Sequence, residues 1–277
     1  MDRLETCRSF YASLITANVG VPPGRLSEAF AAVPRERFAG PGPWRIFTPI
    51  GYIPTPSDDP AFLYQDVTVA LQAEGQINNG QPTLHAVCLA ALRVEPGEAV
   101  VHVGAGSGYY SAVLAELAGP GGSVVGYEVD QGLAERAAAN LADRPNVEVR
   151  NRSGSEGALP ECDVLYVSAG ATDPMDSWLD ALRPGGRLLF PLTPAQGPGA
   201  MLLVTRTPDG LAARFVCQAM FIPCLGARDE EVARRLAEAF QAGGLKDVRS
   251  LRRDAAPDET CWVFGRGWWL STAPLQP

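Results

Sequence analysis

A glycine-rich segment, VVHVGAGSGYY at residues 100–110, is the part of the chain whose residue types most clearly suggest chemistry. Between an apolar run typical of a strand and a segment typical of a helix come Gly104, Gly106 and Gly108. Glycine lets the backbone approach a ligand closely, and a helix N-terminus offers free N–H groups to an anion. The next apolar run ends in Glu128, about twenty residues on, where an acid can hydrogen-bond both hydroxyls of a ribose. The combination predicts a site for a cofactor that contains adenosine.

The spacing of the glycines helps to choose among such cofactors. A dinucleotide-binding turn reads GxGxxG, whereas position 109 is Tyr here and the spacing is GxGxG. S-adenosylmethionine (SAM) has no pyrophosphate, so a glycine turn has less to enclose. The spacing favours SAM and leaves a nicotinamide cofactor as the alternative. The residues expected to line the cofactor are Gly104, Ala105, Gly106, Ser107, Gly108, Tyr109, Glu128 and Val129.

The elements that must position these residues follow an alternating pattern. Strands are expected in EAVVHV, SVVGYEV, NVEVR, DVLYVSA and RLLFPL, and helices in YYSAVLAELAG, GLAERAAANLA and MDSWLDALR. Apolar runs separated by helices are typical of a parallel sheet covered on both faces. A Pro-Gly-Gly turn at 184–186 is expected to end a helix and start a strand.

Further helices are expected at 2–18, 25–38, 82–92, where a proline opens the segment, and 228–242. A closing strand or hairpin is expected in the tail, which holds three of the five tryptophans. Residues 40–60 are rich in proline. We expect them to form a rigid surface wrap, with a lid or substrate-contacting loop as the alternative. Arg35 and Arg37 are expected to form ordinary surface pairs.

Composition excludes several classes of protein. The net charge is −8 and the pI is near 4.9, so no basic surface exists to neutralise the phosphates of a nucleic acid. Six scattered cysteines and two histidines give no usable set of metal ligands. The N-terminus carries acids on both sides of Arg3 and no long apolar run, which argues against a signal peptide or a membrane span. These features predict a cytoplasmic protein without a metal or a membrane partner.

The order of several motifs resembles the protein-L-isoaspartate O-methyltransferase family. The resemblance spans roughly residues 1–226, and its pieces are EAFAAVPRERF (28–38), YQD (64–66), GQ…P (75–82), VHVGAGSGYYSAVLAEL (101–117), YEVD (127–130), NVEVR (146–150), LRPGGRLLFPL (182–192) and FIPCLG (221–226). It implies a doubly wound α/β sheet of the Rossmann-like, SAM-dependent methyltransferase type with an N-terminal helical cap. It also implies methyl transfer from SAM to the free carboxylate of an abnormal aspartyl residue in a protein.

The resemblance sets the expected domains and adds residues to the site. We expect a helical cap with a Pro-rich loop at 1–60, a SAM-binding methyltransferase core at 61–226, and a C-terminal helix and strand extension at 227–277. In this family a His in the position of His85 lies near the methionine end of SAM. The further residues expected at the cofactor are Ile77, His85, Ser153 and Gly154.

The sequence departs from the family pattern at three positions. The family usually carries GQTIS, then one residue and Pro, with the Ser beside the transferred methyl group. This chain reads GQINNGQP at 75–82, so the Ser position falls on Asn79 or Gly80. Where the family usually has an acid after the third strand, this chain has Ser153. Where an acid is common at the end of the first strand, it has His102, for which we expect a structural role.

The Asn-Gly turn has two compatible interpretations. A carboxylate is already ionised at pH 7, so as a nucleophile it needs alignment rather than a general base. The neutral donors of Asn78, Asn79 and the backbone at Gly80 could hold such a carboxylate without quenching it. Alternatively, Asn-Gly is simply a favoured tight turn. We expect the turn to hold the methyl acceptor.

Two acceptors compete within a carboxyl O-methyltransferase. One is isoaspartate in damaged proteins, and the other is an aspartyl or C-terminal carboxylate of a peptide natural product. The altered turn, the Pro-rich segment and the tail favour a changed acceptor. An NAD-dependent oxidoreductase would need a third glycine at position 109 and a Tyr-x-x-x-Lys relay, and the chain has neither. A non-catalytic peptide-binding module is supported only by the missing Ser.

Overall fold

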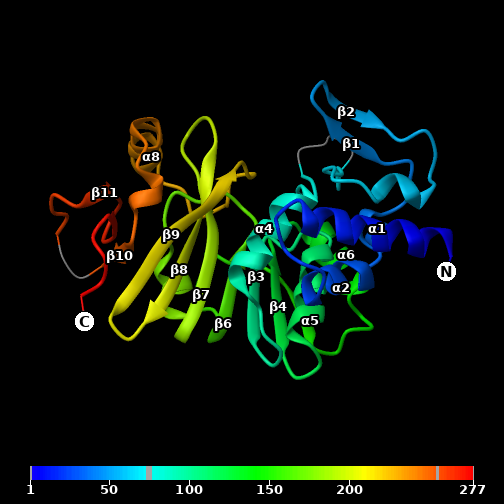
Figure 1. Ribbon diagram of the computed structural model, residues 1–277, viewed down its shortest axis with the longest axis horizontal. Helices are drawn as coiled ribbons and strands as arrows, with labels where there is room; N and C mark the ends of the chain where they lie inside the picture. Colours follow the sequence, from blue (N-terminus) through cyan, green and yellow to red (C-terminus); the bar gives the residue numbers. More distant parts are fainter. Residues whose placement is uncertain (1, 73–76, 254–255, 277) are drawn as a thin grey trace. The chain divides into compact units, whose positions relative to one another are not determined.

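The computed structural model describes residues 2–72, 77–253 and 256–276 (Figure 1). They form two compact units. Unit 1 comprises residues 1–98 and 105–152, and unit 2 comprises residues 99–104 and 153–277. Both units alternate strands with helices, so the predicted α/β class is confirmed. The three expected domains follow different boundaries and stay a prediction.

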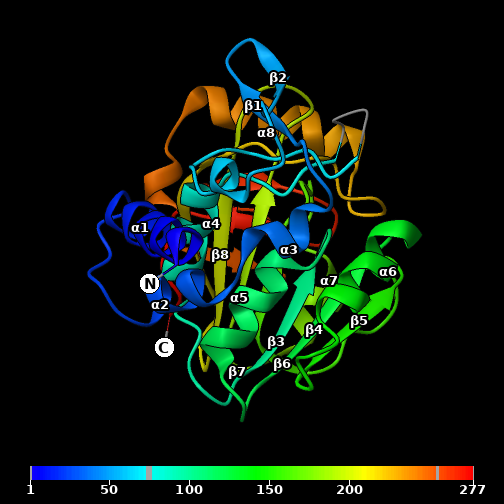
Figure 2. The ribbon, with the colours of Figure 1, turned by 90° about the vertical axis from the view of Figure 1, so that its right-hand side faces the viewer.

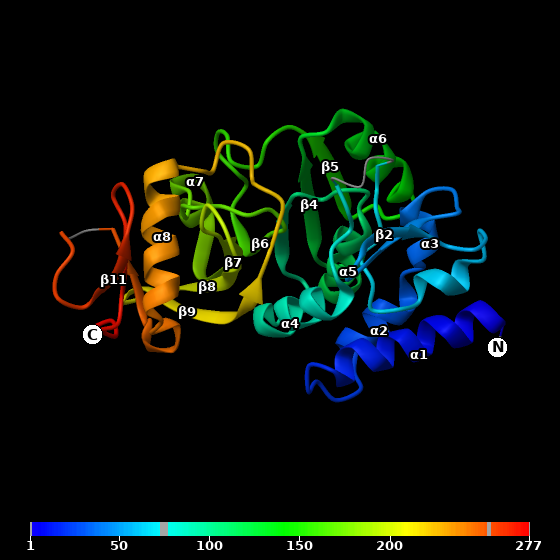
Figure 3. The same ribbon diagram turned by 90° about the horizontal axis from the view of Figure 1, so that it is seen from above.

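Unit 1 begins with three helices, α1 (Arg3–Ala17), α2 (Arg25–Ala32) and α3 (Arg35–Ala39). The first two pack side by side (Figure 3). The single helix predicted over 25–38 is wrong, because Pro34 divides it. The residue before a proline avoids the helical region, and Val33 is accordingly extended, with φ −100° and ψ 110°.

The remaining helices and the parallel strands of unit 1 match the sequence pattern. They are α4 (Pro82–Leu92), α5 (Tyr109–Ala118), α6 (Gln131–Asn140), β4 (Ser123–Glu128) and β5 (Val147–Asn151). Strands β4 and β5 pair in parallel, and α6 packs on both (Figure 2). This arrangement puts Glu128 at the carboxyl end of β4, where α/β folds bind ligands.

The Pro-rich segment contains structure that its composition did not predict. Strands β1 (Arg45–Thr48) and β2 (Gly51–Pro54) form an antiparallel hairpin, followed by the 3₁₀ helix η1 (Pro60–Leu63). Arg45 lies in the first strand and Ile53 in the second, and each strand has only four residues. Alternation of apolar and polar residues over so short a length gives no clear strand signal. The segment therefore contains an ordered hairpin, and its role as a rigid surface wrap or as a substrate-contacting loop stays a prediction.

Unit 2 holds a run of adjacent strands in the order β11-β12-β10-β9-β8-β7-β6-β3. The parallel members are β3 (Ala99–Val103), β6 (Cys162–Val167) and β7 (Leu182–Leu192), and β8 (Gly199–Thr207) and β9 (Gly210–Ala219) add to them antiparallel (Figure 1). The short helix α7 (Asp176–Asp180) precedes β7.

The tail forms a helix and three short strands, as the sequence predicts. Helix α8 (Glu230–Ala242) packs on β11 (Cys261–Phe264), and β12 (Trp269–Ser271) pairs with both β11 and β10 (Ser250–Arg252) (Figure 3). A further 3₁₀ helix, η2 (Leu245–Asp247), connects α8 to β10. Trp268 and Trp269 are buried, so these aromatic side chains serve packing.

The Pro-Gly-Gly prediction is wrong in its details. Helix α7 ends at Asp180, and β7 already begins at Leu182, so 184–186 lie inside the strand. The pairing of β6 with β7 shifts register between Cys162 and Val164. The extra residues are absorbed by this irregularity in the ladder instead of forming a separate turn.

Arg35 also differs from the prediction, because its side chain is buried rather than paired at the surface. It is 2% exposed and donates hydrogen bonds to the backbone carbonyls of Leu63, Gln65 (3.0 Å) and Val67 (3.0 Å). Its guanidinium carbon lies 5.3 Å from the centre of the Tyr11 ring. Arg35 therefore fixes the loop that carries the YQD motif.

Arg37, by contrast, confirms the prediction of a surface pair. Its guanidinium lies 2.7 Å from the carboxylate of Asp143, and the two side chains are 35% and 58% exposed. Exposed pairs of this kind contribute little to stability.

The two arginines give a matched test of the fold. Arg35→Met removes the donor of three backbone carbonyls, and only the bond to Leu63 is fully buried, so we expect a loss of about 3 kcal/mol. Arg37→Met should cost no more than about 1 kcal/mol. Urea unfolding of both variants measures the difference, and equal losses would contradict the structural role of Arg35.

Candidate cofactor and acceptor site

The glycine turn adopts backbone conformations that side chains resist. Gly106 has φ +56° and Gly108 has φ +95°. A Cβ atom on Gly108 would lie 2.8 Å from Leu141 Cδ1, and one on Gly106 would lie 3.3 Å from Leu71 Cδ1. The backbone angle therefore favours glycine at both positions, and the close approach of Leu141 favours it further at Gly108.

The predicted acid, Glu128, joins the end of β4 to this turn, because its carboxylate accepts hydrogen bonds from backbone N–H groups. Glu128 is 8% exposed, and its Oε2 accepts from the Gly106 N–H at 2.7 Å while Oε1 accepts from the Asp130 N–H at 3.0 Å. Each carboxylate oxygen has two lone pairs, so each can accept a further bond from a hydroxyl. A rigid acid with remaining acceptor capacity fits the ribose of SAM. The neighbouring Val129 is 50% exposed and presents an apolar surface beside it.

Two predicted residues of the turn point their side chains inward. Ser107 and Tyr109 are each 2% exposed. The Tyr109 hydroxyl lies 3.4 Å from that of Tyr11, and the carbonyl of Ser107 accepts from Asn140 Nδ2 at 3.0 Å. These side chains stabilise the turn, so what both residues can offer a ligand is their backbone.

In unit 2, Ser153 and Gly154 are held to the segment that contains the FIPCLG motif. Ser153 Oγ lies 2.7 Å from Ser155 Oγ, which donates to the carbonyl of Leu225 at 2.7 Å. A Cβ on Gly154 would lie 2.6 Å from Val103 Cγ2, in the strand that leads to Gly104. Two motifs far apart in the sequence thus meet in this unit.

His102 has the structural setting that the sequence predicts. It is 1% exposed, its ring stacks on Tyr166, and its Nε2 lies 3.0 Å from Ser168 Oγ. Burial lowers the pKa of the His102 imidazole to about 3, so the ring is neutral at physiological pH.

The candidate acceptor turn is described from Ile77 onward, and Gly75 and Gln76 lie outside the described residues. Asn79 Oδ1 accepts from the Val69 N–H at 2.8 Å, and the Asn79 N–H donates to the Val69 carbonyl at 3.0 Å. Asn78 Oδ1 accepts from the Gly80 N–H at 3.0 Å. Both side-chain carbonyls thus stabilise the turn, and the amide –NH₂ groups are the ends that can donate to a carboxylate.

His85 lies directly against this turn. It is 2% exposed and stacks on Tyr110, with ring centres 3.5 Å apart. A Cβ on Gly80, which has φ +70°, would lie 2.2 Å from His85 Nε2. The structure thus brings two predicted site residues together and explains why the turn ends in glycine.

The sequence did not predict which residues fix the candidate acceptor turn to the segments around it. Asp66 accepts from the Thr83 N–H at 2.8 Å and from Gln81 Nε2 at 3.0 Å, and so fixes the start of α4. Asp66 belongs to the YQD motif, whose loop Arg35 binds. The motif itself was the available signal, but its target could be seen only in three dimensions.

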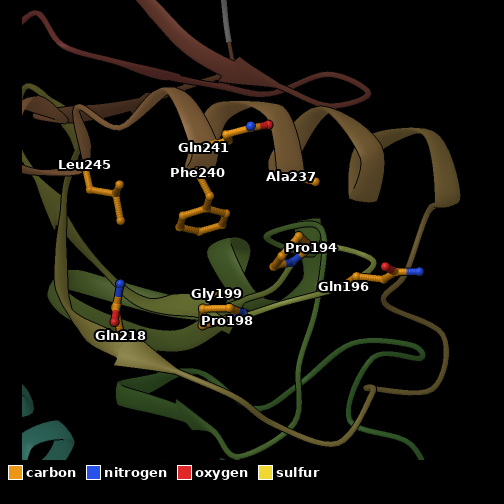
Figure 4. Close-up of a pocket in the computed structure, with 9 residues that line it drawn as sticks. All are labelled: Pro194, Gln196, Pro198, Gly199, Gln218, Ala237, Phe240, Gln241 and Leu245. Atoms are coloured by element: carbon orange, nitrogen blue, oxygen red, sulfur yellow. The ribbon is translucent and has the colours of Figure 1, made fainter.

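A separate cavity of about 270 Å³ lies in unit 2 between α8 and the start of β8 (Figure 4). Its lining includes Phe240, Pro194 and the amide side chains of Gln196, Gln218 and Gln241. No charged side chain lines it, so it does not suit the charged amino-acid part of SAM.

Within the described ranges, no three His, Cys, Asp or Glu side chains cluster as metal ligands would. The helices seen there are also too short or too polar to cross a membrane.

The α/β units have the fold of SAM-dependent methyltransferases. The family model for protein-L-isoaspartate(D-aspartate) O-methyltransferase matches residues 16–229, and the chain belongs to this family. It is accordingly a SAM-dependent carboxyl O-methyltransferase.

Similar proteins agree with this assignment. A protein-L-isoaspartate O-methyltransferase of Rhodopseudomonas palustris (strain BisB5) is 30% identical over 74% of this chain and 87% of its own length. That of Aeropyrum pernix is 35% identical over 73% of each chain. A solved protein-L-isoaspartate O-methyltransferase has a TM-score of 0.68 at 21% identity, covering 84% of this chain and 69% of that one.

A second solved structure, from Plasmodium falciparum, has a TM-score of 0.63 at 17% identity, covering 79% of this chain and 98% of that one. That protein was solved with S-adenosyl-L-homocysteine. At these identities the two structures support the fold alone.

Glu128 provides a test of the cofactor site. Glu128→Gln replaces one acceptor oxygen by an –NH₂ group that faces a backbone N–H, and hydrogen bonds to a charged group contribute about 1.5–3 kcal/mol. We expect SAM affinity to fall roughly 10- to 100-fold by calorimetry. The control is Glu148→Gln on the neighbouring strand, where the acid pairs with Arg150 at the surface. Unchanged affinity in Glu128→Gln would contradict the assignment.

His102 predicts a dependence of stability on pH. Because its folded pKa is about 3 and its unfolded pKa is near 6.5, only the unfolded chain gains a proton between these values. Stability should therefore fall as the pH drops below 6.5, by about 2 kcal/mol at pH 5 from this residue. His102→Gln should lose less stability over that interval in urea unfolding. An identical slope in both proteins would show that His102 does not contribute.

Proposed function

We propose that this enzyme methylates the free carboxylate of an isoaspartyl residue in a protein or peptide, and that the Asn-Gly turn takes the place of the usual Ser. The observation that carries the proposal is the geometry of Asn79. Its Oδ1 is held by the Val69 N–H, so the –NH₂ end is fixed in orientation. The names of the similar proteins supply the acceptor class.

The chemistry requires little of the protein beyond positioning. SAM supplies an electrophilic methyl group, and the carboxylate is ionised at pH 7 and needs no general base. The amide donors of Asn78 and Asn79 are neutral, so they can align the carboxylate without the strong quenching that a cation would cause. We assign to Glu128 and the turn at 104–108 the orientation of the cofactor. Ile77, His85, Ser153 and Gly154 complete the proposed set.

A peptide natural product is the second candidate acceptor. The family match ends at residue 229, so α8 and the three strands of the tail lie outside it. Such additions favour an enzyme adapted to a dedicated peptide, in which the same turn would hold an aspartyl or C-terminal carboxylate.

We also propose a cytoplasmic location. The six cysteines, all within the described residues, form no disulfide, and Cys88, Cys162 and Cys224 are buried. Burial raises the pKa of Cys162 to about 12, so that thiol stays protonated and unreactive. Unpaired cysteines are typical of a reducing compartment.

Asn79 gives the sharpest test of the acceptor site. Asn79→Asp keeps an oxygen for the Val69 N–H but exchanges the donor –NH₂ for a negatively charged acceptor. If the amide holds the acceptor carboxylate, kcat/KM should fall on the order of 100-fold, or ~2.7 kcal/mol, with SAM affinity unchanged. Base-labile methyl transfer to matched isoaspartyl and aspartyl peptides measures this.

Three outcomes separate the alternatives. An unchanged rate in Asn79→Asp would reduce the turn to a structural role. Label on the isoaspartyl peptide alone in the wild-type enzyme would support the proposed acceptor. No label on either peptide, with SAM still bound, would favour the dedicated peptide.

A further inference from the structure

The β1–β2 hairpin is connected to the acceptor turn by a continuous series of backbone pairings. The Phe47 N–H donates to the Thr68 carbonyl at 2.9 Å, and the Ala70 N–H donates to the Arg45 carbonyl at 2.9 Å. Ala70 in turn forms an antiparallel bridge with Asn78. Four short segments therefore lie side by side, from β2 at one end to the turn at the other.

Successive side chains along these four extended segments point alternately to two opposite faces. Ile46 bridges Val69, and both pack on the buried cluster that contains Trp44 and Leu63. Their neighbours in sequence consequently point to the opposite face. Cross-strand partners share a face, so this second face carries Phe47, Tyr52 and Asn78, which we call the hairpin face.

The residues of the hairpin face contact one another. The rings of Phe47 and Tyr52 lie edge to face, with centres 5.2 Å apart. Burial raises the pKa of the Tyr52 phenol, and the nearby side chain of Asn78 lowers it, so the two polar groups are neighbours on this face. Phe47 is 52% exposed and the hairpin tip residue Ile50 is 90% exposed, so apolar surface faces solvent next to the turn.

We propose that the hairpin face binds the acceptor polypeptide, by taking an apolar side chain that flanks the methylated residue. This inference rests on the proposed function of the Asn-Gly turn. The pairing series continues from that turn, so a chain held at the turn in extended form reaches the aromatic pair within a few residues, at about 3.3 Å per residue. Phe and Tyr provide large contact area at low conformational cost, which suits recognition of a flexible peptide.

Tyr52 has a distinct part as a positioning residue. Its phenol lies on the same face as Asn78, whose Oδ1 accepts from the Gly80 N–H. Removing the phenol oxygen would leave the ring to bind peptide and would take away the polar neighbour of the Asn78 amide. Phe47 and Tyr52 should therefore affect different steps, peptide binding and methyl transfer respectively.

The binding test compares Phe47→Ala with Phe10→Ala, a control on α1 that is 67% exposed. The probe is a fluorescent isoaspartyl peptide with Phe or Leu on both sides of the modified residue, followed by anisotropy with SAM present. A second probe is an isoaspartyl residue capped directly on both sides. We expect Phe47→Ala to weaken the long peptide about tenfold and leave the capped probe unchanged, because only uniform binding is lost. Phe10→Ala should bind both probes as the wild-type enzyme does.

Kinetics test the role of Tyr52. Tyr52→Phe should lower kcat for both probes while KM changes little, whereas Phe47→Ala should raise KM for the long peptide and leave kcat unchanged. A loss of fold would lower stability and SAM affinity together, and both are measured alongside. Equal effects of Tyr52→Phe on KM and kcat would overturn its positioning role.

The outcomes distinguish the two proposals. Transfer to the long peptide with no effect of Phe47→Ala would overturn the hairpin face and leave the proposed function intact. Binding that depends on Phe47 without transfer to either probe would retain the face and reject the isoaspartyl acceptor. A change in sedimentation of Phe47→Ala without a change in peptide binding would assign the face to self-association and overturn the proposal.

Discussion

The arrangement of the cofactor site depends on one carboxylate that two backbone N–H groups hold in place. Glu128 ends β4, and its oxygens accept from Gly106 and Asp130. These bonds fix the glycine turn relative to the strand, so the acid serves both the fold and the ligand. The backbone geometry at Gly106 and Gly108 makes the close approach possible, since a Cβ there would meet Leu71 or Leu141. The proposed cofactor site is thus held by hydrogen bonds within the protein, and preorganisation of this kind limits the entropy lost on binding.

The acceptor side follows a different physical principle. No charged group is needed at the turn, because the attacking carboxylate brings its own charge and gains from neutral donors that only orient it. Asn78 and Asn79 are each held by their carbonyl oxygens, and His85 packs against Gly80. Behind the turn, Arg35 binds the YQD loop, and Asp66 of that loop caps the start of α4. A buried cation bound by backbone carbonyls thus supports the proposed acceptor turn, whose described donors, Asn78 and Asn79, are neutral.

Local sequence signals predicted the alternating helices and strands of the α/β core, because each of these elements is long enough to show a clear pattern. The helix from Pro82 to Leu92 and the strands that end at Val103 and Glu128 follow directly from apolar runs and glycine or proline boundaries. The hairpin at 45–54 was not predicted, because four-residue strands in a proline-rich segment show no clear alternation of apolar and polar residues. The prediction of a surface position for Arg35 is wrong, because a charged residue in a helical pattern is normally exposed. Only tertiary packing supplies the three carbonyl partners that Arg35 has in the interior.

The sequence by itself determined the class of fold, the cofactor and the family, because glycine spacing, strand order and the acid after β4 are local or nearly local requirements of the chain. The tertiary structure decided which side chains meet. It placed His85 against Gly80, connected the hairpin to Asn78 through Thr68–Ala70, and joined Ser155 to Leu225. Ser155 and Leu225, for example, are 70 positions apart, and no local pattern encodes such a contact. Contacts of this kind arise because whole elements pack together.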